Sequence, residues 1–432
     1  MDKINIFWFR RDLRIDDNHG FFQALNAGLP VVPVFIFDPA ILAQFPDPKD
    51  ARLTFIHRCL TDLELGFKKH NSSLQVYFSS PEVVFGQLAG KYSIQSVFTN
   101  TDYEPNAILR DQKVEKILQT RGIEFLSFKD QVIFHHDEVV KTDGLPYTVF
   151  TPYSKKWKEK LAAQEIQFFE SEKLLPNLKH LSSDYFPELQ EIGYQVQNIH
   201  FPGKTVDQAL IENYAQIRDF PAENGTSRLG IHLRFGTISI RKLTDFARKH
   251  SEIFLNELIW RNFYMDILWH FPHAAEKSFK PKYGFIPWRN NETEFECWCS
   301  GQTGYPLVDA GMRELNETGF MHNRVRMVVA SFLTKHLLID WRWGEAYFAG
   351  KLLDYELASN NGGWQWASGS GCDAAPYFRV FSPELQTKKF DHDFKYIRKW
   401  VPEFETAKYP KPMVDHAFAR NRAIETYRNA LK

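Results

Sequence analysis

The sequence has few cysteines and no long apolar run. Its cysteines, Cys59, Cys297, Cys299 and Cys372, are too scattered for a disulfide framework, and the single Cys-x-Cys lacks the second pair of a zinc site. No apolar run approaches the roughly eighteen residues of a transmembrane helix. We therefore expect free thiols, no metal site and no membrane partner.

An excess of charge of one sign is also absent. The 53 Lys and Arg residues balance 53 Asp and Glu residues, so net charge indicates neither a nucleic-acid nor a membrane partner. Residues 201–432 carry 31 basic against 27 acidic residues, and residues 1–200 carry 22 against 26. This difference permits a local basic surface in the C-terminal part without showing one.

The remaining composition is that of a globular enzyme. A chain of 432 residues, 44% hydrophobic and 25% charged, is too long for one core and predicts two or more domains. The first residues, MDKINIFWFRRDLRIDD, become charged before a signal-peptide core could form. We expect a cytoplasmic monomer.

The first 130 residues alternate short apolar runs with amphipathic stretches. We predict strands at 4–9, 31–37, 74–78, 96–100 and 123–128, with helices at 50–69, 81–91 and 105–121. This alternation predicts an α/β domain at 1–130 with a doubly wound parallel sheet. No G-x-G-x-x-G follows the first strand, which disfavours dinucleotide binding there.

The periodicity weakens over 131–204, which we interpret as a long interdomain linker. The rest of the chain, 205–432, has helical patterning and predicts an all-helical domain. The expected helices are 206–218, 239–249, 252–270, 305–319, 322–338, 343–355 and 413–430. Eight of the eleven tryptophans fall between Trp260 and Trp366, more indole than core packing usually needs.

Three segments of this domain combine residues suited to a ligand. Gly225-Thr226-Ser227 offers backbone N–H groups and hydroxyls to a phosphate, although a simple helix cap would look the same. Glu257, Trp260 and Arg261, at i, i+3 and i+4, share one helical face that could bind, stack on and anchor a nucleotide. The alternative there is a Glu–Arg pair beside a core tryptophan. In MHNRVRM (321–327), the amide and the arginines face something polar, which could be solvent.

The most informative local segment is DYELASNNGGWQW (354–366). Trp364 and Trp366 lie in an Asn- and Gly-rich stretch without the periodic apolar neighbours of a core segment, so we interpret them as ligand contacts. Residues two apart on a helix point about 200° from one another. The two indoles should therefore serve different partners.

Taken together and in order, FWFRRDLRIDDN, GTSRL, ELIWR, TGYPLVDAGMR, MHNRVRM, NNGGWQW and DAAPYFR resemble the photolyase/cryptochrome family along nearly the whole chain, and most closely the class I cyclobutane pyrimidine dimer photolyases. The resemblance implies an α/β antenna domain, a long linker and a helical domain that binds FAD. It also implies a carbon–carbon lyase of DNA repair that acts on UV-damaged DNA. In such enzymes light excites reduced FAD, which passes an electron to a flipped-out dimer.

The resemblance assigns roles to particular residues. An electron relay is implied at Trp364, Trp341 and Trp288. The implied FAD contacts are Tyr214, Thr226, Ser227, Arg228, Leu229, Gly230, Arg326, Asp354, Tyr355, Glu356 and Asn360, with Arg326 paired to Asp354 and Asn360 beside the flavin nitrogen that gains a proton. The implied DNA contacts are Arg218, Glu257, Trp260, Arg261, Asn323, Arg324, Met327, Trp366 and Arg379. Asn360 and Glu257 are also taken as catalytic.

Some positions depart from the family pattern. Gly230 replaces the usual serine and Glu356 the usual aspartate. In the antenna region, Ala107 holds the position of a glutamate that folate-binding relatives use, and Glu104 is the nearest possible substitute. We therefore rank methenyltetrahydrofolate below a deazaflavin-type chromophore or an empty antenna site.

Three other functions are alternatives to the repair of cyclobutane dimers. A cryptochrome, a blue-light receptor, is the main alternative, but Trp260, Trp366, Asn323 and Met327 keep the repair pocket intact. A six-four photolyase should have histidines where MHNRVRM has Asn323 and Met327. An electron-transfer flavoprotein would leave the DNA-facing residues unexplained.

Overall fold

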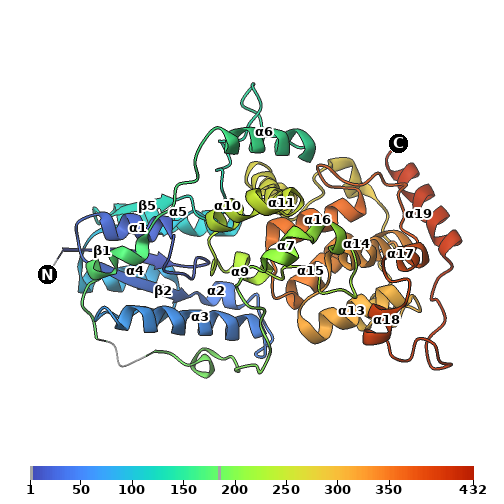
Figure 1. Ribbon diagram of the computed structural model, residues 1–432, viewed down its shortest axis with the longest axis horizontal. Coiled ribbons are helices and arrows are strands. Elements are labelled where there is room, and N and C mark those ends of the chain that lie inside the picture. Colours follow the sequence, from blue (N-terminus) through green and yellow to red (C-terminus); the bar gives the residue numbers. More distant parts are fainter. Residues whose placement is uncertain (1–2, 183–185) are drawn as a thin grey trace. The chain divides into compact units, whose positions relative to one another are not determined.

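The computed structural model describes residues 3–182 and 186–432, which form two compact units (Figure 1). The first unit is built from the chain up to 138 together with 158–205 and 229–246, and the second from 139–157, 206–228 and 247–432. The stretch that we predict as a linker thus contributes to both units. The boundaries 1–130, 131–204 and 205–432 stay predictions.

The first unit contains a parallel sheet of five strands in the order β3-β2-β1-β4-β5. The strands are β1 (Lys3–Phe9), β2 (Val31–Phe37), β3 (Gln75–Phe78), β4 (Ser93–Asn100) and β5 (Glu124–Phe128). Each overlaps a predicted strand. The central strands β1 and β2 are continuous, almost fully buried apolar runs, because both faces of a parallel sheet are covered.

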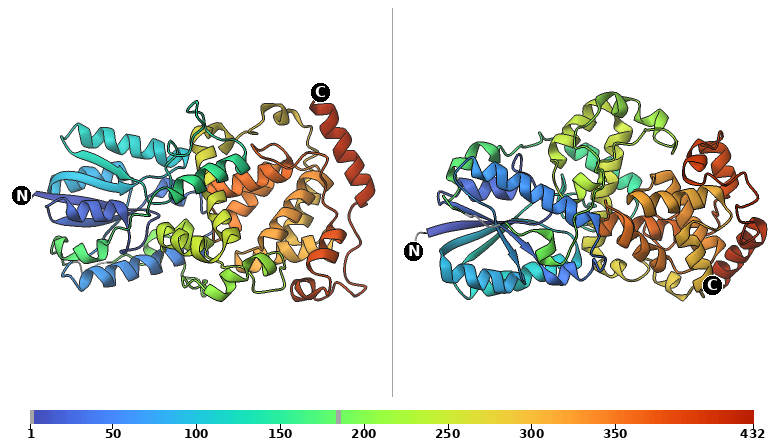
Figure 2. Two further views of the ribbon diagram at one scale, coloured as in Figure 1. Left: turned by 45° about the horizontal axis from the view of Figure 1, so that its top comes forward. Right: turned by 90° about the horizontal axis from the view of Figure 1, so that it is seen from below.

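Helices cover both faces of this sheet (Figure 2). The principal ones are α1 (His19–Asn26), α3 (Ala51–Lys68), α4 (Pro81–Lys91) and α5 (Pro105–Gln119). Successive side chains of β1 point to opposite faces. Ile6 and Trp8 share a core with residues of α4 and α5, while the rings of Phe7 and Phe9 contact those of α1 and α3. The predicted doubly wound α/β class is confirmed.

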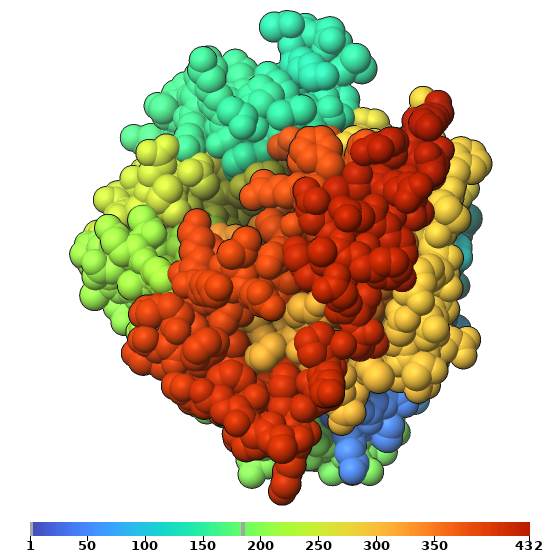
Figure 3. Space-filling model, turned by 90° about the vertical axis from the view of Figure 1, so that its right-hand side faces the viewer, coloured from blue at the N-terminus to red at the C-terminus, as the bar shows by residue number. Residues whose placement is uncertain are grey.

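The second unit is helical, as predicted. Its helices are α7 (Gln208–Glu212), α8 (Tyr214–Ile217), α11 (Glu252–His270), α12 (Glu292–Ser300), α13 (Pro306–Thr318), α14 (Asn323–Ser331), α15 (Trp341–Lys351), α16 (Leu357–Ser368), α17 (Pro383–Phe390), α18 (Lys395–Trp400) and α19 (His416–Ala430). Short helices elsewhere are α2 (Pro39–Leu42) and α9 (Gly230–Arg234), and the longer α6 (Phe150–Ala162) and α10 (Ile240–His250) each have residues in both units. The C-terminal helices form much of the red surface in Figure 3.

Several helices differ from the predicted ranges. The range 252–270 is that of α11, but the predicted helix 322–338 is α14 followed by a π-helical turn at Phe332–His336. The predicted helix 206–218 is two short helices, and α6, α12, α16, α17 and α18 are not in the predicted list. Helix α16 is not predicted from the sequence because its glycines disfavour a helix locally. In the structure the same glycines permit close packing of helices. A Cβ on Gly362 would lie 2.3 Å from the Tyr264 ring of α11.

The core of this unit contains several of the tryptophans between Trp260 and Trp366, among them Trp364, which we interpret as a ligand contact. Trp298, Trp341 and Trp364 are at most 2% exposed and belong to one hydrophobic cluster. Gly344 of α15 lets Trp364 pack closely, since a Cβ there would lie 2.1 Å from the indole. The interpretation that Trp364 lacks core neighbours is therefore wrong, because they come from other helices. No helix of the described residues has the length and apolar character needed to cross a membrane.

Candidate functional site

A pocket of about 420 Å³ in the helical unit gathers most of the predicted site residues. Its walls come from α11, α14, α15, α16 and the turn before α16. The predicted residues that line it are Arg218, Glu257, Trp260, Arg261, Asn323, Arg326, Met327, Asp354, Tyr355, Glu356, Asn360, Trp364 and Trp366. The fold thus brings residues from 257–261, 323–327 and 354–366 into one cavity, while the loop at 225–228 does not line it.

The polar face of α11 lines this pocket as its spacing predicts. Glu257 accepts a hydrogen bond from Arg218 Nη1 at 2.5 Å, and Arg261 Nη2 donates to Glu356 Oε1 at 3.1 Å. Both ion pairs cross between segments. The simpler interpretation, a Glu–Arg pair within one helix, does not account for these contacts.

Tyr214 lies next to the Arg218–Glu257 ion pair. The Arg218 guanidinium lies 5.3 Å from the centroid of the Tyr214 ring. Burial, followed by the negative charge of Glu257, raises the pKa of Tyr214 to about 12. Its phenol therefore stays protonated at neutral pH and can donate a hydrogen bond.

The arginines of α14 face acidic groups. Arg326 Nη2 lies 3.0 Å from Asp354 Oδ2, which confirms the predicted pair. Arg324 Nη2 lies 2.8 Å from Asp219 Oδ1. Arg326 shares the ring of Phe320 with Arg228, whose guanidinium lies 4.5 Å from the ring centroid. Solvent is thus not the main partner of these arginines.

Asn360 has a partner that sequence reasoning missed. Its Nδ2 donates to Glu345 Oε1 at 2.9 Å and to the Glu345 carbonyl at 3.1 Å. Burial raises the pKa of Glu345, against the smaller opposing effect of the hydrogen bond from Asn360. This contact joins α15 to α16 across fifteen residues, a separation that no local pattern marks.

The Glu345–Asn360 pair predicts that the stability of the folded protein depends on pH. Because the pKa of Glu345 is raised in the folded state, its ionisation destabilises the fold as pH rises from the unfolded pKa through the folded one. Glu345→Gln keeps an acceptor for Asn360 and removes this cost. We expect the melting temperature of the variant, measured relative to that of the parent, to be higher at about pH 8 than at about pH 5.

The same melting curves are recorded for Glu317→Gln, which alters an exposed carboxylate on α13. That control should show no comparable pH-dependent gain. A Glu345→Gln difference that is equal at both pH values would contradict a raised pKa.

The predicted relay tryptophans share one part of the core. Trp364 and Trp341 lie in the buried cluster, and Trp288 packs against it half-buried. The ring of Trp364 lies 6.0 Å from that of Trp298, which sequence reasoning did not select. Trp366, two residues on, lines the pocket and lies 6.4 Å from Phe381. The two indoles therefore contact different rings although both line the pocket, and the assignment of different partners to them stays a prediction.

Other predicted residues do not line the pocket. Among them are Tyr214, Trp288, Arg324, Trp341, Arg379 and the residues of the loop at 226–228. Leu229 and Gly230 open the segment that belongs to the sheet-containing unit. Arg379 is exposed, with its guanidinium 5.4 Å from Phe381. The roles of these residues stay predictions.

Ala107 stands where folate-binding relatives have a glutamate, and Glu104 is the nearest carboxylate that could replace it. Glu104 Oε1 accepts a hydrogen bond from Arg11 Nη1 at 2.7 Å and another from Arg234. A carboxylate already held by two guanidinium groups is poorly placed to bind a pterin. The structure thus weakens Glu104 as a substitute.

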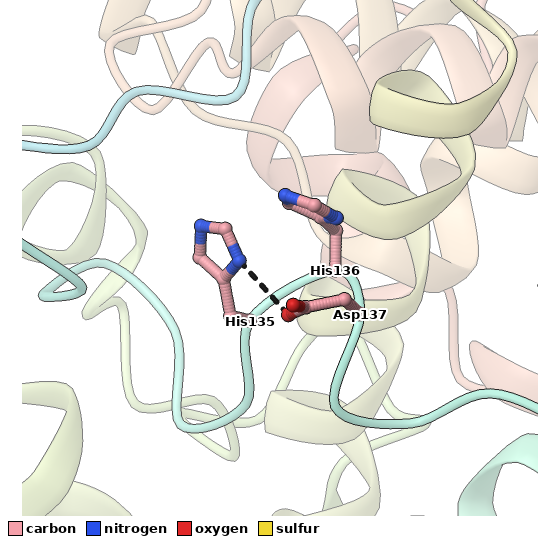
Figure 4. Close-up of side chains that lie close together, drawn as sticks. All are labelled: His135, His136 and Asp137. Atoms are coloured by element: carbon pink, nitrogen blue, oxygen red, sulfur yellow. Dashed lines mark hydrogen bonds and ion pairs between the residues drawn. The ribbon is translucent and has the colours of Figure 1, made fainter.

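The sequence predicts free thiols and no metal site, and the described cysteine, histidine and acidic residues leave both predictions unchanged. All four cysteines are free, as predicted, and burial raises the pKa of Cys59 and Cys299 to about 12. Within the described ranges, one group of three potential ligands, His135, His136 and Asp137, has ligand atoms within 4.8 Å of one another (Figure 4). His135 and Asp137 are joined at 3.1 Å. The expected absence of a metal stays a prediction.

Comparison with known proteins gives matches along nearly the whole chain. Residues 5–172 match the family model for DNA photolyase, and residues 254–408 that for the FAD binding domain of DNA photolyase. A deoxyribodipyrimidine photo-lyase of Synechococcus is 36% identical, with 99% of this chain and 96% of that protein covered.

Two solved structures are similar to this one. A bacterial class III photolyase from Agrobacterium tumefaciens has a TM-score of 0.86 at 32% identity, with 100% of this chain and 98% of that chain covered. A cryptochrome of Synechocystis has a TM-score of 0.83 at 25% identity, with 98% and 99% covered.

Proposed function

Because this chain belongs to the DNA photolyase family, we propose that the pocket of its helical unit binds FAD and the pyrimidine dimer. The protein is an enzyme of DNA repair, a deoxyribodipyrimidine photo-lyase that splits cyclobutane pyrimidine dimers under light. The single observation that carries the site assignment is the convergence of thirteen predicted residues on one pocket. Light-dependent repair of an oligonucleotide with one thymine dimer, with no repair in the dark, tests this function.

The residues of the pocket fit a flavin. Asn360, Tyr355 and the Arg326–Asp354 pair provide donors and acceptors suited to the polar edge of a flat heteroaromatic ring. Gly363 leaves room beside them, since nothing lies within 4 Å of the position that its Cβ would take. Reduced FAD, when bound and excited by light, supplies the electron that splits the dimer.

The chain's own residues bind and orient the lesion in this proposal. Trp260 and Trp366 offer aromatic surface for the flipped pyrimidines, and stacking returns part of the few kcal/mol that unstacking costs. Glu257 offers a carboxylate to the base edges, and its ion pair with Arg218 holds it at the pocket wall. Half-buried Glu345 accepts a hydrogen bond from Asn360 Nδ2 and so fixes the orientation of that amide in the pocket wall.

The cryptochrome alternative is the weaker one. Glu257, Trp260, Asn323, Met327 and Trp366, which the resemblance assigns to the dimer, line the same pocket as the residues assigned to FAD. A receptor that does not repair DNA needs no such pocket beside its flavin. We also propose that the enzyme acts as a cytoplasmic monomer, a state that light scattering would test.

The pigment content of the purified protein tests the cofactor proposal. We expect one FAD per chain and no stoichiometric methenyltetrahydrofolate, because Ala107 offers no carboxylate and Glu104 is held by two arginines. Losing one buried hydrogen-bond partner costs about 1–3 kcal/mol, or roughly five- to 150-fold in affinity. Mild acid extraction followed by mass spectrometry identifies the pigments. Stoichiometric folate would contradict the antenna assignment, and a protein without FAD would contradict the pocket assignment.

A further inference from the structure

Trp260 is stacked on one side by an aromatic ring from a distant part of the chain. The ring of Phe150, at the start of α6, lies parallel to it, with centroids 3.6 Å apart and an interplanar angle of 5°. Trp260 also lines the pocket. One face of this indole is therefore covered before any substrate binds.

The segment that carries Phe150 is held against α11 by further buried contacts. Tyr153 Oη donates to Asp266 Oδ2 at 2.6 Å, and Trp157 Nε1 donates to Asn262 Oδ1 at 3.2 Å. Both rings are 1% exposed. Because positions 150, 153 and 157 share one face of a helix, these contacts fix the position of Phe150 along α11.

A third contact links Phe150 to the loop after α16. The backbone N–H of Phe150 donates to Asp373 Oδ2 at 3.0 Å. This N–H lies in the first turn of α6, where no helical carbonyl can accept it. Asp373 therefore caps α6 from more than two hundred residues away and fixes the end of the helix that carries the ring.

We propose that Phe150 is a positioning residue for Trp260, so that the indole presents a fixed plane to the flipped pyrimidines. This inference rests on the proposed function of the pocket. Phe150 occupies the side of Trp260 on which a base could otherwise stack, so only one face remains for the lesion. A stacking partner that is held in place beforehand loses less conformational freedom when the substrate binds.

The inference predicts a selective loss of affinity for damaged DNA. Phe150→Leu keeps an apolar side chain but removes the ring, and we expect binding of an oligonucleotide with one thymine dimer to weaken about two- to tenfold, the range of one aromatic pair. Affinity for the intact oligonucleotide and FAD content should stay at the parent values. Phe150→Tyr, which keeps the ring, should bind like the parent, and Phe150→Met repeats the loss of stacking with a different side chain.

A double-mutant cycle separates positioning from general stability. If Phe150 acts through Trp260, Phe150→Leu should have no further effect on dimer binding in a Trp260→Ala background. Phe418→Leu, which removes an exposed ring on α19, is the matched control and should not alter binding. Provided that the parent prefers damaged DNA, either of two results would overturn this inference. One is an unchanged affinity of Phe150→Leu for the dimer, and the other is an equal loss of affinity with and without Trp260. A parent protein that shows no such preference would instead overturn the proposed function.

Discussion

Trp364→Phe is expected to abolish the light-driven reduction of oxidised FAD while leaving repair by the chemically reduced enzyme intact. Trp364 is 2% exposed and lies in the core cluster that includes Trp341 and contacts Trp288. Phenylalanine is much harder to oxidise than tryptophan, so the variant cannot pass an electron along this path. The measurement is the loss of oxidised-flavin absorbance under blue light with an external electron donor.

Trp341→Phe and Trp288→Phe should have the same effect, whereas Trp400→Phe, on α18, should not. The FAD content of each variant is measured to show that it is folded. This control matters most for Trp364→Phe, because the smaller ring leaves a void beside Gly344. Photoreduction of Trp364→Phe at the parent rate would show that the relay does not pass through this residue. Trp298, 6.0 Å from Trp364, would then be the next residue to replace.

Trp366→Ala should weaken binding of dimer-containing DNA by about 1–3 kcal/mol, the value of one base stacked on an aromatic ring, or about five- to 150-fold. Trp366 lines the pocket with Trp260 but lies on α16, so the two indoles reach the same cavity from different helices. Fluorescence anisotropy of a labelled oligonucleotide in the dark measures the affinity.

Trp366→Phe is the matched control and should retain most of the affinity, because it keeps an aromatic face. FAD content should be unchanged in both variants. If Trp366→Ala binds damaged and intact DNA with the same ratio of affinities as the parent, Trp366 does not contact the lesion.

Regular patterning explains which parts of the fold could be predicted. The central strands β1 and β2 are short, almost fully buried apolar runs, and α11 is a long, mostly apolar segment without glycine or proline between its N-cap Ser251 and Phe271. Helix α16 could not be predicted in this way. Its glycines disfavour a helix locally but permit contact with Tyr264, and only the packed structure supplies that reason.

The predicted site residues came from a resemblance and from helical spacing, and their partners came from the structure. Spacing placed Glu257, Trp260 and Arg261 on one face, but it could not indicate that Arg218 and Glu356 pair with two of them. Glu345 and Phe150 contact site residues across different elements, so nothing near them in the sequence marks them. Such tertiary contacts are invisible to periodicity.

The most direct test of the proposed function is repair by the purified, chemically reduced enzyme under blue light. Two oligonucleotides are compared, one with a thymine cyclobutane dimer and one with a six-four product at the same position. We expect the dimer to be restored in the light and not in the dark, and the six-four product to persist. An enzyme that contains FAD and yet leaves the dimer intact in the light, or one that repairs the six-four product, would contradict this function.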